Sequence, residues 1–533
     1  MSAPTPTLSK EHDLADEKAS TEIYERAPVV VTAEDDKRIR RATDKVILIV
    51  LIVVYWLQVL DKTVLGYTAA VGLKEDAHLV GNEYSTLSSI APYAQIGFQP
   101  LGAYLLVKIK PKTLVPSLVA LWGASLMGMG GANSFGSLVA TRILLGCFEA
   151  SCLAAFSLIT TSWYRRVEQP LRVAAWYSMN GMGTIVGALV VWALSHAHSK
   201  LHTHQLVFLT LGGLTVLTAP FVWYFLDNGP SSAKFLSAED RLKAVERLRA
   251  NRNAGDSTKF KWPQVKEFAL DPKTYLFATL TLLSNVMPYS YSTFGPLLLN
   301  GIAGLDKRTT LLLQPPFGCL QILAIWLTSW LAYRFRAKGI FYALLYLPVL
   351  LGFALLYALP RDRANLGPLL FGFYLQAFSF GANPLLIGWI GANVAGKTKK
   401  SATMSLYMAA SAAGNIIAPN LFKASDAPLY LHGLMMNLIL TAITLLNIAA
   451  LVAVLWWQNQ QKMKQRVANG KPAKLVDLSM ERKYNEALAP PRADEIEEIP
   501  SVDGTATAAP EEEAKPADED LTDKQNDEFI YVY

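Results

Sequence analysis

Charged residues inside an apolar run are the first feature of this sequence that suggests chemistry. In VYWLQVLDKTVLGY, residues 54–67, an acid and a base stand side by side. Positions three or four apart share one face of a helix, which predicts one polar stripe, Tyr55, Gln58, Asp61 and Lys62, with the two charges at its flanks. A charge near the bilayer centre costs about 2.5–3.5 kcal/mol, so such residues usually mark an ion or substrate path.

A second stretch, RILLGCFEASC, repeats the arrangement. Arg142, Gly146 and Glu149 share one helical face, and the two charges lie two turns, or about 10.5 Å, apart. Each therefore needs a partner elsewhere, and Asp61 and Lys62 supply one of each sign. Two alternatives stay open: the pairs serve packing alone, or the charges of the first stretch reach the outer surface by snorkelling.

The composition indicates a membrane protein. Of 533 residues 52% are hydrophobic and 17% charged, whereas soluble domains carry about 25% charge. A spanning helix needs roughly 20 apolar residues, and lipid requires each segment to satisfy its own backbone hydrogen bonds. Twelve segments meet this length, and we expect helices over 46–68, 84–107, 113–132, 136–163, 173–195, 206–227, 275–300, 309–333, 339–359, 365–394, 401–421 and 433–457.

Lys and Arg residues in the connecting loops predict the orientation. Four loops on one side hold twelve of them, and the loops on the other side hold seven. The richer side should be cytoplasmic, and both termini lie there. The first 20 residues lack the apolar core of a signal peptide. We expect a multi-pass protein of the plasma membrane.

A polar stretch divides the helices into six and six. Residues 228–274 begin with a helix breaker, and Ser237 and Asp240 have capping-box spacing before an apolar stripe. One amphipathic helix on the cytoplasmic surface is predicted there, between two pseudo-symmetric bundles with a substrate site near the midplane. We expect a mostly disordered tail over residues 1–45, a six-helix bundle over 46–227 and a linker over 228–274. A second six-helix bundle should span 275–458. The second tail, 459–533, is basic and then acidic and should be mostly disordered.

Other polar residues within the expected helices could complete a pocket, because an amide or phenol at this depth needs a partner. A hydrogen bond between helices is the alternative for each of them. The candidates are Asn180, Asn285, Tyr289, Tyr374, Asn383 and Asn415.

Two further motifs favour ordinary structural roles. The histidines of HAHSKLHTH, residues 196–204, suggest a metal or pH-sensing site, but exposed loop histidines are the favoured interpretation. Gly181, Gly183 and Gly187 imitate a dinucleotide-binding loop, yet no strand precedes them, which favours close helix packing. No set of residues indicates an enzyme, a bound metal or another cofactor.

Long blocks of the sequence resemble the fungal allantoate-permease group, the anion:cation symporter family within the major facilitator superfamily. They include LDKTVLGYTAAVGLKEDAHLVGNEYSTLSSI, RILLGCFEAS, SWYRRVEQPLRVAAWYSMNG, NPLLIGWIGANVAGKTKKS, GNIIAPNLF and DLTDKQNDEF. The resemblance covers nearly all of 46–457 and returns near the carboxyl end. It implies an all-α membrane fold of twelve transmembrane helices in two bundles.

The resemblance also implies proton-coupled uptake of a small organic anion. Asp61 and Glu149 would then couple to protons. Lys62 and Arg142 would bind a carboxylate, which Arg can hold through two parallel hydrogen bonds. The expected partners are this anion, such as a ureide or a vitamin acid, protons and the lipid bilayer, without nucleic acid and with the protein as a monomer. An exporter of the same fold and a nutrient sensor that does not transport are the alternatives.

Overall fold

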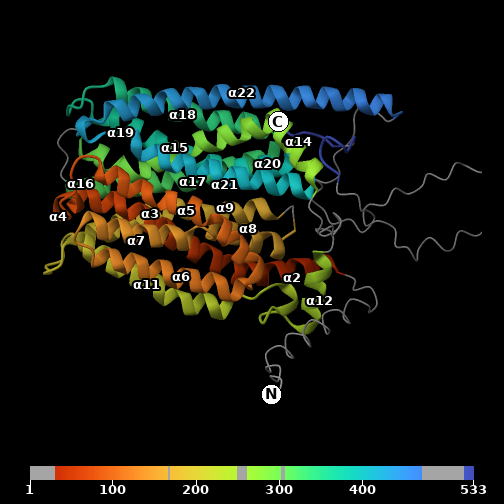
Figure 1. The fold of residues 1–533 in the computed structure, drawn as a ribbon, viewed down its shortest axis with the longest axis horizontal. Coiled ribbons are helices and arrows are strands. Elements are labelled where there is room, and N and C mark those ends of the chain that lie inside the picture. The colour runs from red at the N-terminus through yellow and green to blue at the C-terminus, as the bar shows by residue number, and fades with distance from the viewer. Residues whose placement is uncertain are drawn as a thin grey trace, which may run out of the picture.

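The protein is a bundle of helices (Figure 1). The computed structural model describes residues 31–165, 168–248, 261–301, 307–335, 337–470, 521–527 and 529–533, and within these ranges no strand occurs. The predictions of disorder for residues 1–30 and 471–520 lie outside the described residues.

The first half of the chain forms one group of helices, which we call the N half. The helix α2 (Ala33–Thr43) and the π-helical turn η1 (Asp44–Leu48) lead into it. Its helices are α3 (Ile49–Val71), α4 (Leu73–Asp76), α5 (Glu83–Lys108), α6 (Pro111–Gly130), α7 (Phe135–Glu149), α8 (Cys152–Trp163), α9 (Gln169–Tyr177), α10 (Met179–Leu194) and α11 (Thr203–Phe225).

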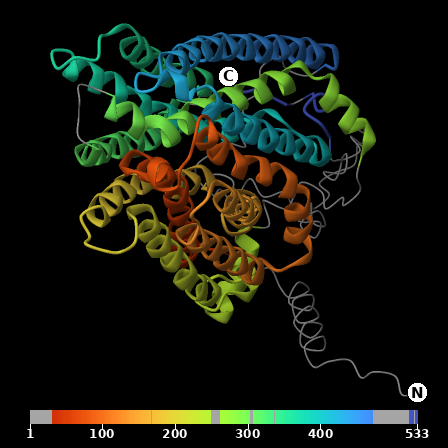
Figure 2. The same ribbon diagram turned by 60° about the vertical axis from the view of Figure 1, so that its left-hand side comes forward.

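The second group, the C half, follows a linker with η2 (Pro230–Ser232), α12 (Ala238–Arg247) and α14 (Trp262–Leu270). Figure 2 separates the halves by colour, with the N half in orange and yellow and the C half in green to blue. The elements of the C half are α15 (Pro272–Asn300), α16 (Lys307–Leu312), α17 (Gln314–Phe335), α18 (Lys338–Ala358), α19 (Leu366–Leu375), η3 (Gln376–Gly381), α20 (Ala382–Asn393), α21 (Lys397–Asn420), η4 (Ala424–Asp426) and α22 (Leu431–Ala468).

The two ends of the bundle differ. One end, which we call the linker end, carries α2, α12, α14 and the last residues of the sequence (Figure 1). The opposite end carries α4 and α16. Since consecutive long helices run up and down between these ends, a residue's position along its helix gives its depth in the bundle.

Nine described segments are long and apolar enough to cross a membrane. They are Ala33–Val71, Pro111–Gly130, Phe135–Trp163, Leu171–Leu194, Thr203–Phe225, Lys307–Ala332, Lys338–Ala358, Leu366–Asn393 and Leu431–Ala468. The helices α5, α15 and α21 are equally long but more polar, and α21 packs against both α5 and α15. Together these segments are consistent with the twelve helices expected from the sequence, because helices inside a bundle need less apolar surface than those facing lipid.

Glycines set the distance between the halves at two places. A Cβ added at Gly181 of α10 would collide with the Gly318 carbonyl oxygen of α17, and one at Gly318 would collide with the Gly181 carbonyl oxygen. Gly66 of α3 lies equally close to the carbonyl oxygen of Ser292 on α15. The prediction that Gly181, Gly183 and Gly187 serve close helix packing is confirmed, since Gly183 also lies against Val59 of α3 and Gly187 lies against Tyr67 of the same helix.

Capping bonds fix several helix starts. Ser134 and Thr32 form capping boxes before α7 and α2. Ser237 accepts a hydrogen bond from the Asp240 backbone N–H, so the predicted start of a linker helix is correct. The single helix expected in the linker is wrong, however, because α14 follows α12 and begins at Trp262 with Pro263 in its first turn.

Two expected helices are interrupted and both tails are partly ordered. The segment 136–163 breaks between α7 and α8 at Ala150 and Ser151, and 365–394 narrows into the 3₁₀ helix η3. Residues 33–43 form α2, which begins with the capping box of Thr32 and Asp35, and Asp35 also lies 3.0 Å from Lys243 of α12. Residues 521–527 and 529–533 pack on the C half. Disorder is therefore the wrong description for these two parts of the tails.

The glycine contact gives a first prediction. Gly181→Ala should destabilise the purified protein by about 1–3 kcal/mol, because the added methyl group has no space against α17. Thermal melting in detergent measures the loss. Gly213→Ala on α11 is the matched control, since nothing lies within 4 Å of its added Cβ, and equal melting of the two variants would contradict the prediction.

Candidate substrate cavity

A polar cavity lies between the two halves, with a volume of about 180 Å³. Its N-half wall comes from α3, α5, α7, α8, α9 and α10, and its C-half wall comes from α15, α17, η3, α20 and α21. Nine of the twelve predicted site residues line it: Tyr55, Gln58, Lys62, Glu149, Asn180, Asn285, Tyr289, Asn383 and Asn415.

An ion pair occupies the N-half wall. Lys62 Nζ lies 3.7 Å from Glu149 Oε2, and the Gln95 side-chain amide donates to the same oxygen at 3.2 Å. The Glu149 side chain is 1% exposed and the Lys62 side chain is 36% exposed, so the ammonium group is the part of the pair that the cavity can reach. Glu149 Oε1 is buried and has no hydrogen-bond partner. The contact between Lys62 and Glu149, one of the pairs expected from the sequence, is present.

Two close contacts of α5 bring Glu149 into position. A Cβ at Gly146 would collide with the Ala91 carbonyl oxygen, so glycine lets α7 approach α5 and places Gln95 beside Glu149. Further along α5, Gly102 lies against Ser151, just beyond the end of α7. The residue pattern RILLGCFEAS thus has a packing reason for its glycine as well as an electrostatic one.

The structure corrects the expected position of Asp61. Neighbouring residues on a helix point about 100° apart; because Lys62 faces the cavity, Asp61 faces the interior of the N half. It is 1% exposed, neither carboxylate oxygen has a hydrogen-bond partner, and it does not line the cavity. The charges of Glu149, Arg142 and Lys62 act on it, and Trp122 of α6 lies beside it.

Arg142 also lies outside the cavity wall. Two turns of α7 separate it from Glu149, toward the opposite end, and it is 3% exposed with no hydrogen-bond partner for Nε. The alternative of an ion pair between Arg142 and Asp61 is not found among the described contacts. Its charge reaches Tyr84 and Tyr289, so Arg142 contributes to the field near the cavity without touching it.

Hydrogen bonds link the halves on the linker side of the cavity. The Asn383 amide on α20 donates to the Tyr177 hydroxyl on α9 at 2.9 Å, and Asn383 also bonds Asn285 of α15. Asn180 donates to the Tyr55 hydroxyl at 3.0 Å. All of these side chains line the cavity, and the bond between Asn383 and Tyr177 joins the two halves there.

One predicted residue is misplaced and several were missed. Tyr374 does not line the cavity, because its helix turns the hydroxyl toward the Leu313 carbonyl, which it bonds at 3.1 Å. Sequence reasoning missed Gln95, Tyr177, Gln314 and Gln321, although a glutamine within an apolar helix is a usable signal. Gln314 Nε2 is buried without a partner, whereas Gln321 accepts a bond from Thr184 across the halves at 2.9 Å.

The histidine loop shows no metal site among its described residues. His202 and His204 lie 3.2 and 3.3 Å from the two oxygens of Asp76, and His196 bonds the Trp192 carbonyl. One carboxylate thus contacts both rings, which stack on each other with their centroids 5.7 Å apart. The favoured interpretation, exposed loop histidines, holds for His196 and His198. It is wrong for His204, which is buried in the first turn of α11.

Comparison with known proteins defines the class. The model of the Major Facilitator Superfamily matches residues 51–419, and the chain belongs to this family. The fold resembles a bacterial homolog of the human lysosomal transporter Spinster, with a TM-score of 0.55 at 14% identity, covering 76% of this chain and 95% of the other. The protein is therefore a multi-pass membrane transporter, as predicted, and not an enzyme.

Fungal transporters are the relatives in sequence. An uncharacterized transporter of Schizosaccharomyces pombe is 31% identical, covering 81% of this chain and 82% of its own. The thiamine pathway transporter THI73 of Saccharomyces cerevisiae is 32% identical, covering 74% and 75%. The allantoate permease of the same yeast is 27% identical, covering 85% and 86%. The predicted resemblance to the allantoate-permease group is confirmed.

Gln314 provides a second prediction. Gln314→Leu should raise the KM for the transported substrate about 2- to 10-fold, the value of one hydrogen bond, and leave the melting temperature unchanged, since the free protein gives Nε2 no partner. Gln376→Leu is the control: this residue lies outside the cavity and bonds the Val349 carbonyl. It should lower the melting temperature and leave KM unchanged. The opposite pattern would show that Gln314 does not contact substrate.

Proposed function

We propose that the protein imports a small organic anion together with protons by alternating access. The observation that carries the proposal is the pair of Lys62 and Glu149 in a cavity between the two halves. The proposed substrate is a carboxylate such as allantoate or another ureide, nicotinate or another vitamin acid.

The pair offers a direct way to couple anion and proton. A substrate carboxylate that approaches the exposed Lys62 ammonium competes with Glu149 for it. Glu149 then loses its nearest cation and is left buried, a state in which a carboxylic acid costs less than a carboxylate. A proton on Glu149, at the unpartnered Oε1, would restore electroneutrality. Asp61, buried without hydrogen-bond partners, is the second candidate proton site.

Energetics favour coupling for an importer. Moving one net charge across the membrane changes the free energy by about 2.3 kcal/mol for each 100 mV of membrane potential. An anion alone is driven outward by a negative-inside potential, whereas an anion with one proton crosses without net charge and with two protons is driven inward. The names of two relatives, an allantoate permease and a thiamine pathway transporter, support a small organic substrate.

The remaining assignments are also proposals. The excess of Lys and Arg in the loops supports a cytoplasmic linker end, with the protein acting as a monomer in the plasma membrane. Arg142 is assigned an electrostatic role near the cavity in place of a direct contact with substrate, because it lies outside the wall. We also propose the domain boundaries expected from the sequence. A tail ends at residue 45, the first bundle at 227, the linker at 274 and the second bundle at 458, and a second tail follows.

Uptake tests the proposal directly. A yeast strain that lacks its own organic-anion permeases should accumulate one labelled anion when it expresses this protein. Accumulation should be greater at external pH 4.5 than at pH 7 and should vanish with a protonophore. Accumulation of substrate only after loss of the protein would instead support the exporter, and binding without flux would support the sensor.

Substitutions of Glu149 and Lys62 should affect proton coupling and substrate affinity separately. Glu149→Gln should abolish accumulation against a gradient while exchange of labelled for unlabelled substrate persists, because the amide keeps the shape of the side chain and cannot take up a proton. Exposed Glu34→Gln should behave as the wild type. Accumulation by Glu149→Gln equal to that of the wild type would exclude Glu149 as the proton site.

Lys62 is expected to act on substrate affinity. Lys62→Met should raise the KM at least tenfold, the usual cost of losing a hydrogen bond to a charged group. The exposed base Lys200 lies at the opposite end, and Lys200→Met is the matched control. Equal KM values for the two variants would mean that the substrate does not contact Lys62.

A further inference from the structure

The 521–533 segment lies along the linker end of the C half, beside α14 (Figure 1). It contacts α14 of the linker and four helices of the C half through side chains: Glu267 of α14, Lys273 of α15, Trp389 and Asn393 of α20, Lys399 of α21, and Asn459, Lys462 and Arg466 of α22. The helices α14 and α15 are consecutive, and so are α20 and α21, but these two pairs and α22 come from separate parts of the chain. The segment therefore joins three parts of the chain that no short loop connects.

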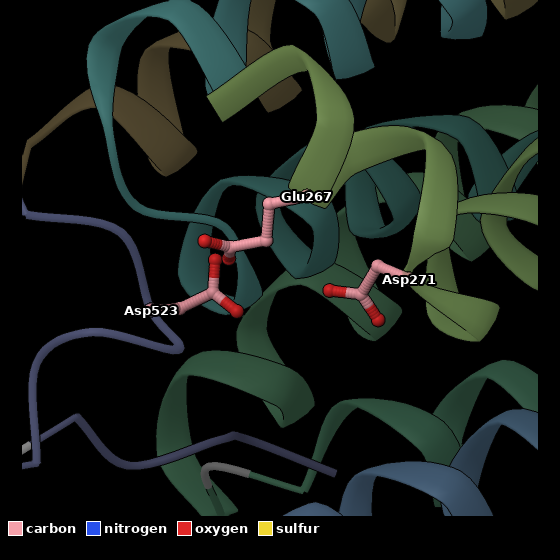
Figure 3. Close-up of side chains that lie close together, drawn as sticks. All are labelled: Glu267, Asp271 and Asp523. Atoms are coloured by element: carbon pink, nitrogen blue, oxygen red, sulfur yellow. The ribbon is translucent and has the colours of Figure 1, made fainter. Parts of the chain in front are cut away.

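Asp523 of this segment is buried between two cations. Its carboxylate bonds Lys273 Nζ and lies 2.9 Å from Lys399 Nζ, and all three residues are fully buried. In Figure 3 the carboxylate of Asp523 enters from the C-terminal segment toward Glu267 and Asp271, which come from α14 and its junction with α15. The three acids have the spacing of a metal site.

A lysine takes the place of a metal ion in this cluster. Lys399 Nζ lies 2.8 Å from Glu267 and 2.9 Å from Asp271, in addition to its contact with Asp523. Burial disfavours a charged Asp523, but Lys273 and Lys399 outweigh this cost and hold the pKa of Asp523 below its usual range. The carboxylate is therefore charged at neutral pH, and it supplies a counter-charge that the buried lysines need.

The backbone of the segment is recognised as well. Trp389 Nε1 and Asn393 Nδ2 donate to the Val532 carbonyl at 2.7 and 2.9 Å, and Asn393 Oδ1 accepts from the Val532 N–H at 2.9 Å. Asn459 makes the same two-way contact with the Tyr531 backbone, at 2.7 and 2.9 Å. Each asparagine bonds both the N–H and the carbonyl of one residue. It therefore recognises the peptide backbone in the same way as a neighbouring β-strand would.

A third contact completes the binding surface. Lys462 Nζ donates to the carbonyls of Lys524 and Asn526, each at 2.7 Å. The Tyr531 hydroxyl bonds Asp523 Oδ2 at 2.9 Å and its ring lies under Lys273 Nζ at 4.3 Å. The two ends of the segment therefore meet at the buried charge.

We propose that the linker end of the C half is a peptide-binding site whose ligand is the 521–533 segment of the same chain. Occupancy of this site holds α14, α20 and α21 together. Two of these helices, α20 and α21, also carry Asn383 and Asn415 into the cavity. The inference concerns a site separate from the cavity, and it stands whatever substrate the protein transports.

Cleavage of the connection tests the proposal in the full-length protein. A protease recognition sequence inserted after Gly504 allows the purified protein to be cut in detergent. The fragment with residues 521–533 should stay with the bundle during size-exclusion chromatography, and an excess of synthetic LTDKQNDEFIYVY should displace it. The same peptide with Asp523→Asn should displace it at least tenfold less effectively. Separation of the wild-type fragment from the bundle on cutting would overturn the proposal.

Variants of the intact chain identify the charge that matters. Asp523→Asn should release the cut fragment, whereas Asp527→Asn should retain it, because Asp527 is only partly buried and its carboxylate bonds the side-chain amide of the exposed Asn469. Equal retention of the two variant fragments would contradict the proposed role of the buried carboxylate.

A double substitution distinguishes the loss of the buried ion pair from a general failure to fold. Asp523→Leu should lower the melting temperature of the uncut protein by several degrees, because Lys273 loses a counter-charge. Lys273→Met combined with Asp523→Leu should recover at least half of that loss, since an apolar pair leaves no uncompensated charge. A double variant no more stable than Asp523→Leu alone would overturn the assignment of the pair.

Discussion

The placement of Lys62 and Glu149 depends on keeping two opposite charges out of lipid and within reach of one another. The surrounding helices meet this constraint in a specific way. Glycine contacts let α7 approach α5 and let α3 approach α15, so that the charges are covered by protein on all sides except the cavity. The cavity is thus the one place where the ammonium group gains a new partner.

The same constraint explains which helices are polar. The long helices α5, α15 and α21 are less apolar than the nine segments that could cross a membrane on composition alone. They carry Gln95, Asn285 and Asn415 to the cavity, and α21 packs against the other two. Amides in these helices cost little because they face water-accessible space and hydrogen-bond partners in place of lipid.

The sequence predicted the family, the helices and nine of the twelve site residues, because charges and amides are costly in lipid and therefore face the inside of a bundle. It did not predict which of two adjacent charges faces the cavity: Asp61 and Lys62 differ by about 100° of rotation, and packing against Trp122 and the neighbouring helices decides the rotation. For the same reason the sequence did not show that Tyr374 points away from the cavity or that Gln314 faces it. The order of 521–533 was missed because its partners, such as Lys273 and Asn393, come from distant parts of the chain.

The linker end has a consequence for movement. Its described ion pairs each join segments of the same half: Arg247 on α12 bonds Glu168 of the N half, and Lys399 bonds α14 and Asp523 of the C half. At the opposite end Glu75 and Lys307 pair across the halves. Rotation that opens the linker end therefore separates no described pair of opposite charges there. One described contact that such a rotation breaks between the halves beside the cavity is the hydrogen bond of Asn383 with Tyr177, which involves no formal charge.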